Sequence, residues 1–177
     1  MRPTDRIAVT GPNGTGKSTL LDAILDDLAL PEDRLLLMPQ EVSAGRSTEL
    51  LNDLKSLARS EQGKADLGLV MSIVSRLGSR PAQLLESEEP SPGELRKLLL
   101  ALGIVKKPNL LVLDEPTNHL DLLSIESLEQ ALAGCPCGLL IVSHDQRLVS
   151  ALTDIEWSIT SEGDAQSGGD SYLEVKR

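Results

Sequence analysis

The chain has 177 residues, enough for one domain with its own hydrophobic core. Its formal net charge of −10 argues against nucleic-acid binding over the whole surface, because phosphate contacts require Lys and Arg. No apolar run approaches the ~20 residues that span a bilayer, and the N-terminus lacks the apolar region of a signal peptide. We therefore expect a cytoplasmic protein without membrane insertion, in which Cys135 and Cys137 are reduced thiols in a turn.

The predicted elements alternate between strands and helices, except in the middle of the chain. Short apolar runs predict buried strands, and apolar residues at helical spacing predict helices between them. The run over 110–113 is uniformly apolar and is expected to be a central strand. In chain order, the elements are a strand over 7–10, a helix over 17–28, strands over 34–38 and 110–113, a helix over 122–133, and strands over 138–142, 155–160 and 171–175.

Residues from about 43 to 105 show helical spacing only and predict a helical insert in an otherwise α/β chain. Within the insert, Ser79 is predicted to cap a short helix that has Pro81 in its first turn. The Gly- and Ser-rich residues 161–171 predict a mobile hairpin loop. We expect a single domain over residues 1–177 with a mainly parallel sheet.

The loop after the first strand reads G-P-N-G-T-G-K-S-T and is predicted to be a P-loop, since a strand precedes it and a helix follows. Its glycines let backbone N–H groups surround phosphate oxygens, and the helix N-terminus adds its dipole. Lys17 would bring positive charge to the β- and γ-phosphates, and the Ser18 hydroxyl would bind Mg²⁺. The predicted ATP-binding residues are Gly11, Asn13, Gly14, Gly16, Lys17, Ser18, Thr19 and Gln40.

Two adjacent carboxylates follow the most apolar strand. Asp114 is predicted to hold Mg²⁺, and Glu115 to polarise the attacking water, because such a pair is unfavourable unless something cationic uses it. His144 follows the next strand and would lie beside Glu115 if the two strands are parallel neighbours. Gln40 is expected to be a further Mg²⁺ ligand and water sensor, whereas His119 is expected in a turn away from phosphate.

The segment S-P-G-E opens the last helix of the insert. A serine, a glycine and a helix N-terminus together make a second anion site, too far from the P-loop to reach the same phosphate within one chain. The simpler interpretation is a helix cap. The functional interpretation is that Ser91, Gly93 and Glu94 clamp the γ-phosphate of ATP bound to a partner.

The P-loop, S-P-G-E, D-E-P-T-N-H-L-D-L and V-S-H-D follow one another in an order that resembles ATP-binding cassette (ABC) ATPases, and within them the ABC-F family. The resemblance runs from the P-loop through His144. It implies a P-loop NTPase fold of ABC type and Mg²⁺-dependent hydrolysis of ATP to ADP and phosphate by Glu115 and His144. It also implies two cassettes face to face, with Asp121 at the dimer seam. The partner would be a second copy, or the missing half of a twin-cassette chain whose C-terminal cassette this sequence resembles.

The chain departs from the ABC-F pattern in having one cassette without a long basic linker, no aromatic residue ahead of the P-loop, and Pro90 where the signature usually has Leu. It therefore resembles an isolated or truncated cassette. Three functions stay open. They are an ABC-F ATPase acting on the ribosome in translation or antibiotic resistance, the ATP-binding subunit of an ABC membrane transporter, and a non-hydrolysing dimerisation or regulatory module.

Overall fold

The computed structural model describes residues 2, 4–28, 30–31, 34–61, 63–87, 89–118, 120–161 and 171–176, and its strands form one six-stranded sheet. The order across the sheet is β2-β3-β4-β1-β5-β6. The first five strands run parallel, and β6 pairs antiparallel with β5. The strands are β1 (Arg6–Thr10), β2 (Leu35–Met38), β3 (Leu110–Asp114), β4 (Gly138–Val142), β5 (Ile155–Ser161) and β6 (Ser171–Lys176). The predicted α/β class with a mainly parallel sheet is confirmed.

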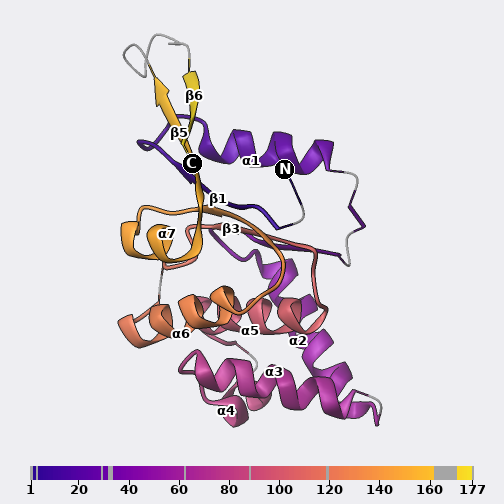
Figure 1. Cartoon of the computed structure of the whole chain (residues 1–177). Helices are drawn as coiled ribbons and strands as arrows, with labels where there is room; N and C mark the ends of the chain where they lie inside the picture. Colours follow the sequence, from indigo (N-terminus) through magenta and orange to yellow (C-terminus); the bar gives the residue numbers. More distant parts are fainter. Residues whose placement is uncertain are drawn as a thin grey trace.

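Helices cover both faces of this sheet, and a helical layer extends away from one of them (Figure 1). α1 lies alone on one face, whereas α5 and α6 lie on the other, with α3 and α4 beyond them. The helices are α1 (Lys17–Asp27), α2 (Ala44–Arg59), α3 (Lys64–Arg76), α4 (Pro81–Glu86), α5 (Pro92–Val105), α6 (Leu122–Ala133) and α7 (Gln146–Leu152). α2, α3 and α4 follow one another without a strand, as predicted for the insert. None of the helices in the described part of the chain is both long and apolar enough to cross a membrane.

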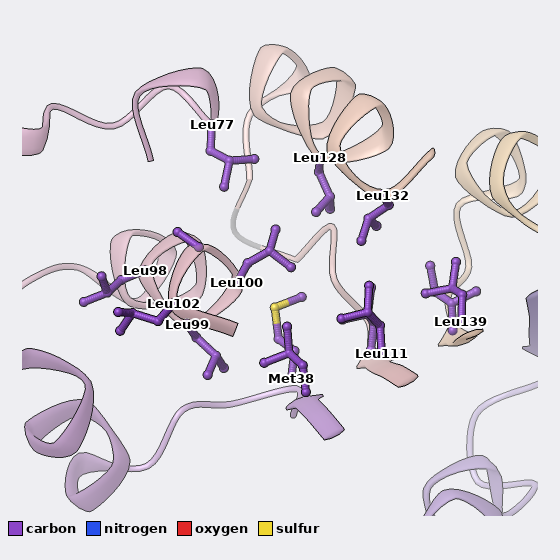
Figure 2. Packing of buried hydrophobic residues seen from close by; sticks show 14 of the residues in the cluster. Met38, Leu77, Leu98, Leu99, Leu100, Leu102, Leu111, Leu128, Leu132 and Leu139 are labelled. Atoms are coloured by element: carbon purple, nitrogen blue, oxygen red, sulfur yellow. The ribbon is translucent and has the colours of Figure 1, made fainter. Parts of the chain in front are cut away.

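Alternate strand residues build two separate hydrophobic clusters, one on each face of the sheet. Ile7 and Val9 of β1 pack toward Leu21 of α1, whereas Ala8 between them joins the larger cluster under the other helices. This follows from the period-2 geometry of a strand that is buried on both faces. Figure 2 shows the larger cluster, in which leucines of α5 and α6 meet the side chains of β2, β3 and β4.

α5 packs against the sheet at very short range. An added Cβ at Gly103 would lie less than 3 Å from three side-chain atoms of Leu36 in β2. The helix backbone therefore lies directly on the edge strand, and the position of α5 relative to the ends of β2 and β3 is closely defined.

One local prediction is wrong, and one helix was not predicted. Arg80, not Ser79, is the N-cap of α4, and it makes no side-chain cap hydrogen bond. Ser79 instead closes the preceding helix, because its N–H donates to Val74 O while that of Gly78, at φ 77°, donates to Ser75 O. These two bonds are the Schellman arrangement that ends many helices. The seven-residue α7 was not predicted at all.

The cysteines also differ from the expectation of reduced thiols. Cys135 and Cys137 form a disulfide, with their Cα atoms 5.4 Å apart. The Cys135 N–H donates to Leu132 O as α6 ends, and this turn holds the two cysteines within bonding range. The predicted hairpin loop falls largely on residues 162–170, outside the described residues.

Candidate nucleotide-binding site

The carboxyl ends of β1, β3 and β4 meet at a cleft of about 650 Å³. Ligands of open α/β sheets bind at this end of the strands, because the loops that follow adjacent strands converge there. The cleft gathers residues predicted from separate motifs, together with a few that were not. Its lining is Asn13, Gly14, Gly16, Lys17, Ser18, Thr19, Gln40, Asp114, Glu115, Thr117, Asn118, Val142, His144 and Asp145.

The loop between β1 and α1 contributes backbone N–H groups and the Lys17 ammonium to the cleft. Gly16 is the N-cap of α1 at φ 91°, and it contributes no side-chain cap, so the first N–H groups of the helix remain available to an anion. The Lys17 ammonium donates to the carbonyls of Gly11 and Pro12 at 2.9 Å each. Gly11 itself is not part of the cleft lining. A Cβ there would lie 2.5 Å from Ile159 O, so the loop can pass β5 only with glycine at this position.

Asp114 ends β3 in a half-buried position at the base of the cleft. Burial raises the pKa of this carboxyl, and the positive charges of Arg96 and Lys17 partly offset that effect, while Asp22 raises the pKa further. An ionised Asp114 is therefore favoured when an additional cation binds beside it.

Glu115 and His144 come together as the sequence predicted, because β3 and β4 are parallel neighbours with Asp114 in register with Val142. His144 Nε2 lies 3.3 Å from Glu115 Oε1 and 3.1 Å from Asn13 Oδ1, and the hydrogen bond is made to Asn13. The side chain of Glu115 is only 12% exposed, whereas that of His144 is 55% exposed. Glu115 Oε1 has no hydrogen-bond partner among the described residues, so a buried acceptor is available to a water or ligand donor.

The backbone of Glu115 has an unusual conformation for a residue with a side chain, with φ 47°. Its N–H donates to Val142 O at 2.8 Å, and its carbonyl accepts from Arg96 Nη2 at 2.7 Å. Both of its polar backbone groups are thus fixed, and the direction of the carboxylate is defined by contacts on either side.

Ser91, Gly93 and Glu94 do not line the cleft. Ser91 caps α5 in a capping box: its Oγ accepts from the Glu94 N–H at 3.3 Å, and Glu94 Oε2 accepts from the Ser91 N–H at 2.9 Å. The Ser91 hydroxyl also donates to Glu94 Oε2 at 2.8 Å. The helix-cap interpretation therefore holds for this conformation, and it leaves open a second use of the same residues.

Asp121 has a comparable capping role at the start of α6. Its carboxylate accepts from the Ser124 N–H at 2.7 Å, and hydrogen bonding to Ser124 lowers its pKa. The side chain is exposed and lies outside the cleft. His119, expected in a turn away from phosphate, falls outside the described residues.

Four functional candidates were not predicted. Thr117 and Asn118 line the cleft and follow the carboxylate pair after one proline. Asp145 also lines it, and caps α7 by accepting from the N–H groups of Arg147 and Leu148. The fourth is Arg96, a buried cation that contacts the segments carrying Gln40 and Glu115. An Asp immediately ahead of a helix and an Arg within an apolar helical run were the signals available in the sequence.

Comparison with known proteins agrees with this geometry. The family described as "ABC transporter" matches residues 1–118. The probable ATP-binding protein YbiT of Escherichia coli O157:H7 is 36% identical over 97% of this chain and 34% of that protein. The ribosome protection protein VmlR of Bacillus subtilis is 36% identical over 90% of this chain and 30% of its own length. The chain thus spans about a third of the curated relatives it matches.

Solved structures support the fold alone, since their identities are low. The ATP-binding subunit of an ABC transporter has a TM-score of 0.69 at 19% identity, covering 88% of this chain and 74% of that chain. The archaeal ribosome recycling factor aABCE1, solved with ribosomal stalk protein aP1, has a TM-score of 0.67 at 23% identity, covering 95% and 34%. The ABC-type fold and the resemblance predicted from the motifs are confirmed.

Proposed function

This chain belongs to the ABC transporter family of ATP-binding cassettes, and we propose that it binds ATP with Mg²⁺ in the cleft and hydrolyses it to ADP and phosphate. The observation that carries the proposal is the convergence of Lys17, Asp114, Glu115 and His144, from separate elements, on one cleft. A cation, a half-buried acid, a buried free acceptor and an imidazole in one place are the groups that phosphoryl transfer to water requires.

The residues present fit both ligands. Lys17 and the uncapped N–H groups of α1 suit the phosphates. Asp114, Ser18 and Gln40 offer the hard oxygen ligands that Mg²⁺ prefers, and Mg²⁺ in such sites is bound mostly by phosphates and water with few protein ligands. The raised pKa of Asp114 agrees with a position that a bound cation would stabilise. Bound Mg²⁺ would neutralise charge that develops on the phosphates.

Glu115 is proposed to accept a hydrogen bond from the attacking water through Oε1. This acceptor is buried and unpaired among the described residues, so it is the group in the cleft best prepared for such a donor. His144 is proposed to orient the γ-phosphate relative to that water, since its Nε2 already links the P-loop residue Asn13 to the neighbourhood of Glu115.

The active site is proposed to be completed by a second cassette. Ser91, Gly93 and Glu94 lie at an accessible helix N-terminus outside the cleft, where the helix end and the Ser91 hydroxyl suit an anion presented by another molecule. Asp121, exposed at the start of α6, is proposed to lie at the seam. A second copy or another cassette of a longer chain would serve equally.

We further propose that the cassette acts on the ribosome and therefore in the cytoplasm. Support comes from relatives whose names state a ribosomal or resistance role, such as VmlR and the tylosin resistance ATP-binding protein TlrC of Streptomyces fradiae, 36% identical over 84% of this chain. The second candidate is a transporter subunit, which the description of the matching family as "ABC transporter" supports. Co-sedimentation of the hydrolysis-deficient protein with ribosomes in ATP, but not in ADP, would distinguish the two.

The first test combines nucleotide binding, phosphate release and light scattering on three proteins. The unsubstituted chain is expected to bind Mg–ATP and release phosphate. Lys17→Ala is expected to lose binding, whereas Glu115→Gln should bind normally, release phosphate only at a low residual rate and become dimeric in ATP. A Glu115→Gln chain that stays monomeric at saturating Mg–ATP would refute the two-cassette site for this chain. Unchanged binding in Lys17→Ala would refute the assignment of the cleft.

A further inference from the structure

We infer that Arg96 is a positioning residue that couples the N-terminal end of α5 to Gln40 and Glu115 together. This inference rests on the proposed function, because it concerns how two groups of that site are aimed. Arg96 does not line the cleft, so it would act through the residues that do.

Arg96 is a buried cation in a helix whose other buried side chains are apolar. It is 2% exposed, and Leu95, Leu98 and Leu99 around it belong to the buried apolar set. Isolated buried guanidinium groups are unfavourable unless their donors are used. Burial lowers the pKa of Arg96, while Asp114 and Glu115 raise it. A leucine or methionine would satisfy packing here, so packing alone does not account for an arginine.

The donors of Arg96 go to backbone carbonyls of two different segments. Nη1 donates to Pro39 O at 3.2 Å and to Gln40 O, both directly after β2. Nη2 donates to Glu115 O at 2.7 Å and to Asp114 O at 3.3 Å, at the end of β3. One planar group therefore bridges the segment that carries the proposed Mg²⁺ and water sensor and the segment that carries the proposed water-polarising carboxylate.

These hydrogen bonds help to determine the orientation of the Glu115 side chain. Its φ of 47° is held by the N–H bond to Val142 on one side and, on the other, by two bonds to its carbonyl, of which the Arg96 bond at 2.7 Å is shorter than that from the Asn118 N–H at 3.2 Å. Without the guanidinium, that carbonyl keeps only the longer hydrogen bond from the Asn118 N–H at 3.2 Å, and the peptide is held less firmly in its unusual conformation. The carboxylate would then leave its place beside His144.

The same group is rigidly connected to the proposed partner-binding end of α5. Ser91 is the N-cap of this helix, and Arg96 lies in its second turn. Among the described residues Arg96 has no carboxylate ion pair, and its Nε is buried without an acceptor, so carbonyls alone hold the head group. A shift of α5 on contact with a partner's nucleotide would move both segments as one unit. Gln40 and Glu115 would thus become aligned only when the partner is engaged.

The test compares Arg96→Lys and Arg96→Gln with the exposed control Arg76→Gln at the end of α3. Arg96→Gln is expected to lower kcat by ~10- to 100-fold, the scale of a small misplacement of catalytic groups, with little change in ATP affinity. Arg96→Lys keeps the charge but cannot bridge both segments, and is expected to recover only part of kcat. Arg76→Gln should match the unsubstituted chain.

A second measurement separates positioning from loss of fold. In a Glu115→Gln background, Arg96→Lys should cause no further loss of residual hydrolysis, because Arg96 acts through Glu115. Fully additive losses, or a kcat for Arg96→Lys equal to that of the unsubstituted chain, would overturn the inference. If Arg96→Gln unfolds, Arg96→Lys alone decides the matter. Absence of ATP hydrolysis in the unsubstituted chain would instead refute the proposed function.

Discussion

His144 and Glu115 lie with Nε2 and Oε1 3.3 Å apart, although they follow different strands and are separated by α6 in the chain. The contact exists because β3 and β4 are parallel neighbours whose carboxyl ends coincide. Asn13 holds the imidazole from the other side at 3.1 Å. The imidazole is thus hydrogen-bonded to the P-loop and lies beside the carboxylate, whose Oε1 has no hydrogen-bond partner among the described residues.

Substituting His144→Ala should lower ATP turnover by ~100-fold while leaving ATP affinity nearly unchanged, because the residue is proposed to act on the reacting geometry. Asn13→Ala removes the hydrogen bond to the imidazole but leaves the imidazole itself, and should cost less, roughly 10-fold. Steady-state phosphate release and equilibrium nucleotide binding measure the two quantities. Arg147→Ala is the matched control, since Arg147 follows His144 by three residues, is exposed and does not line the cleft. Equal losses in Arg147→Ala and His144→Ala would contradict this assignment.

The capping box at α5 predicts opposite effects for its two members. The Ser91 hydroxyl donates a hydrogen bond to Glu94 Oε2 and is therefore not available to a phosphate. The carboxylate of Glu94 would also repel a phosphate that approaches the same helix end. Glu94→Gln should therefore tighten the ATP-dependent dimer of Glu115→Gln several-fold, whereas Ser91→Ala should weaken it. Sedimentation equilibrium at several protein concentrations measures both. A weaker dimer for Glu94→Gln would contradict this expectation. It would show that dimerisation depends on the intact capping box and not on release of the Ser91 hydroxyl from Glu94.

Asp121 predicts a pH-dependent contribution to stability. Its folded-state pKa lies below the ordinary 3.8, so its contribution is fully present above the unfolded-state pKa and is lost as pH falls through the folded-state pKa. Asp121→Asn keeps a capping side chain but not the charge. The melting temperature of the nucleotide-free chain should exceed that of Asp121→Asn at pH 7, and the difference should shrink toward pH 3. A difference that is independent of pH would contradict this cause.

Two glycines within helices should respond in opposite directions to the same substitution. Gly103→Ala places a methyl group against the buried side chain of Leu36 and should destabilise the fold by ~1–3 kcal/mol. Gly68 in α3 has open space around its missing Cβ, so Gly68→Ala should stabilise by ~0.5–1 kcal/mol. Urea unfolding measures both. Similar values for the two would mean that α5 can move away from β2 at little cost.

Much of the site could be predicted because its residues directly follow buried strands. Apolar runs locate the strands, and parallel pairing brings the residues after them together, as for Glu115 and His144. Arg96 could not be predicted in the same way. Its partners are backbone carbonyls, which carry no sequence signal, and only the packing of α5 brings the guanidinium to them.

The local errors have a similar origin. Ser79 is a residue type that often caps a helix N-terminus. Here the left-handed conformation of the neighbouring Gly78 directs the Ser79 N–H to Val74 O, so that Ser79 belongs to the C-terminal end of α3. α7 is only seven residues long, too short for periodicity to distinguish a helix from a loop. The disulfide between Cys135 and Cys137 depends on a turn whose geometry the sequence pattern did not define.

The left-handed backbone of Glu115 has an evolutionary consequence. A residue with a Cβ in this conformation destabilises the fold by ~1–2 kcal/mol, which glycine would relieve. Because Glu115 is proposed to polarise the attacking water, selection for a more robust fold and selection for ATP turnover would act in opposite directions at residue 115. In descendants released from the need to hydrolyse ATP, this position should be among the first to drift toward glycine or asparagine, while the surrounding strands stay as they are.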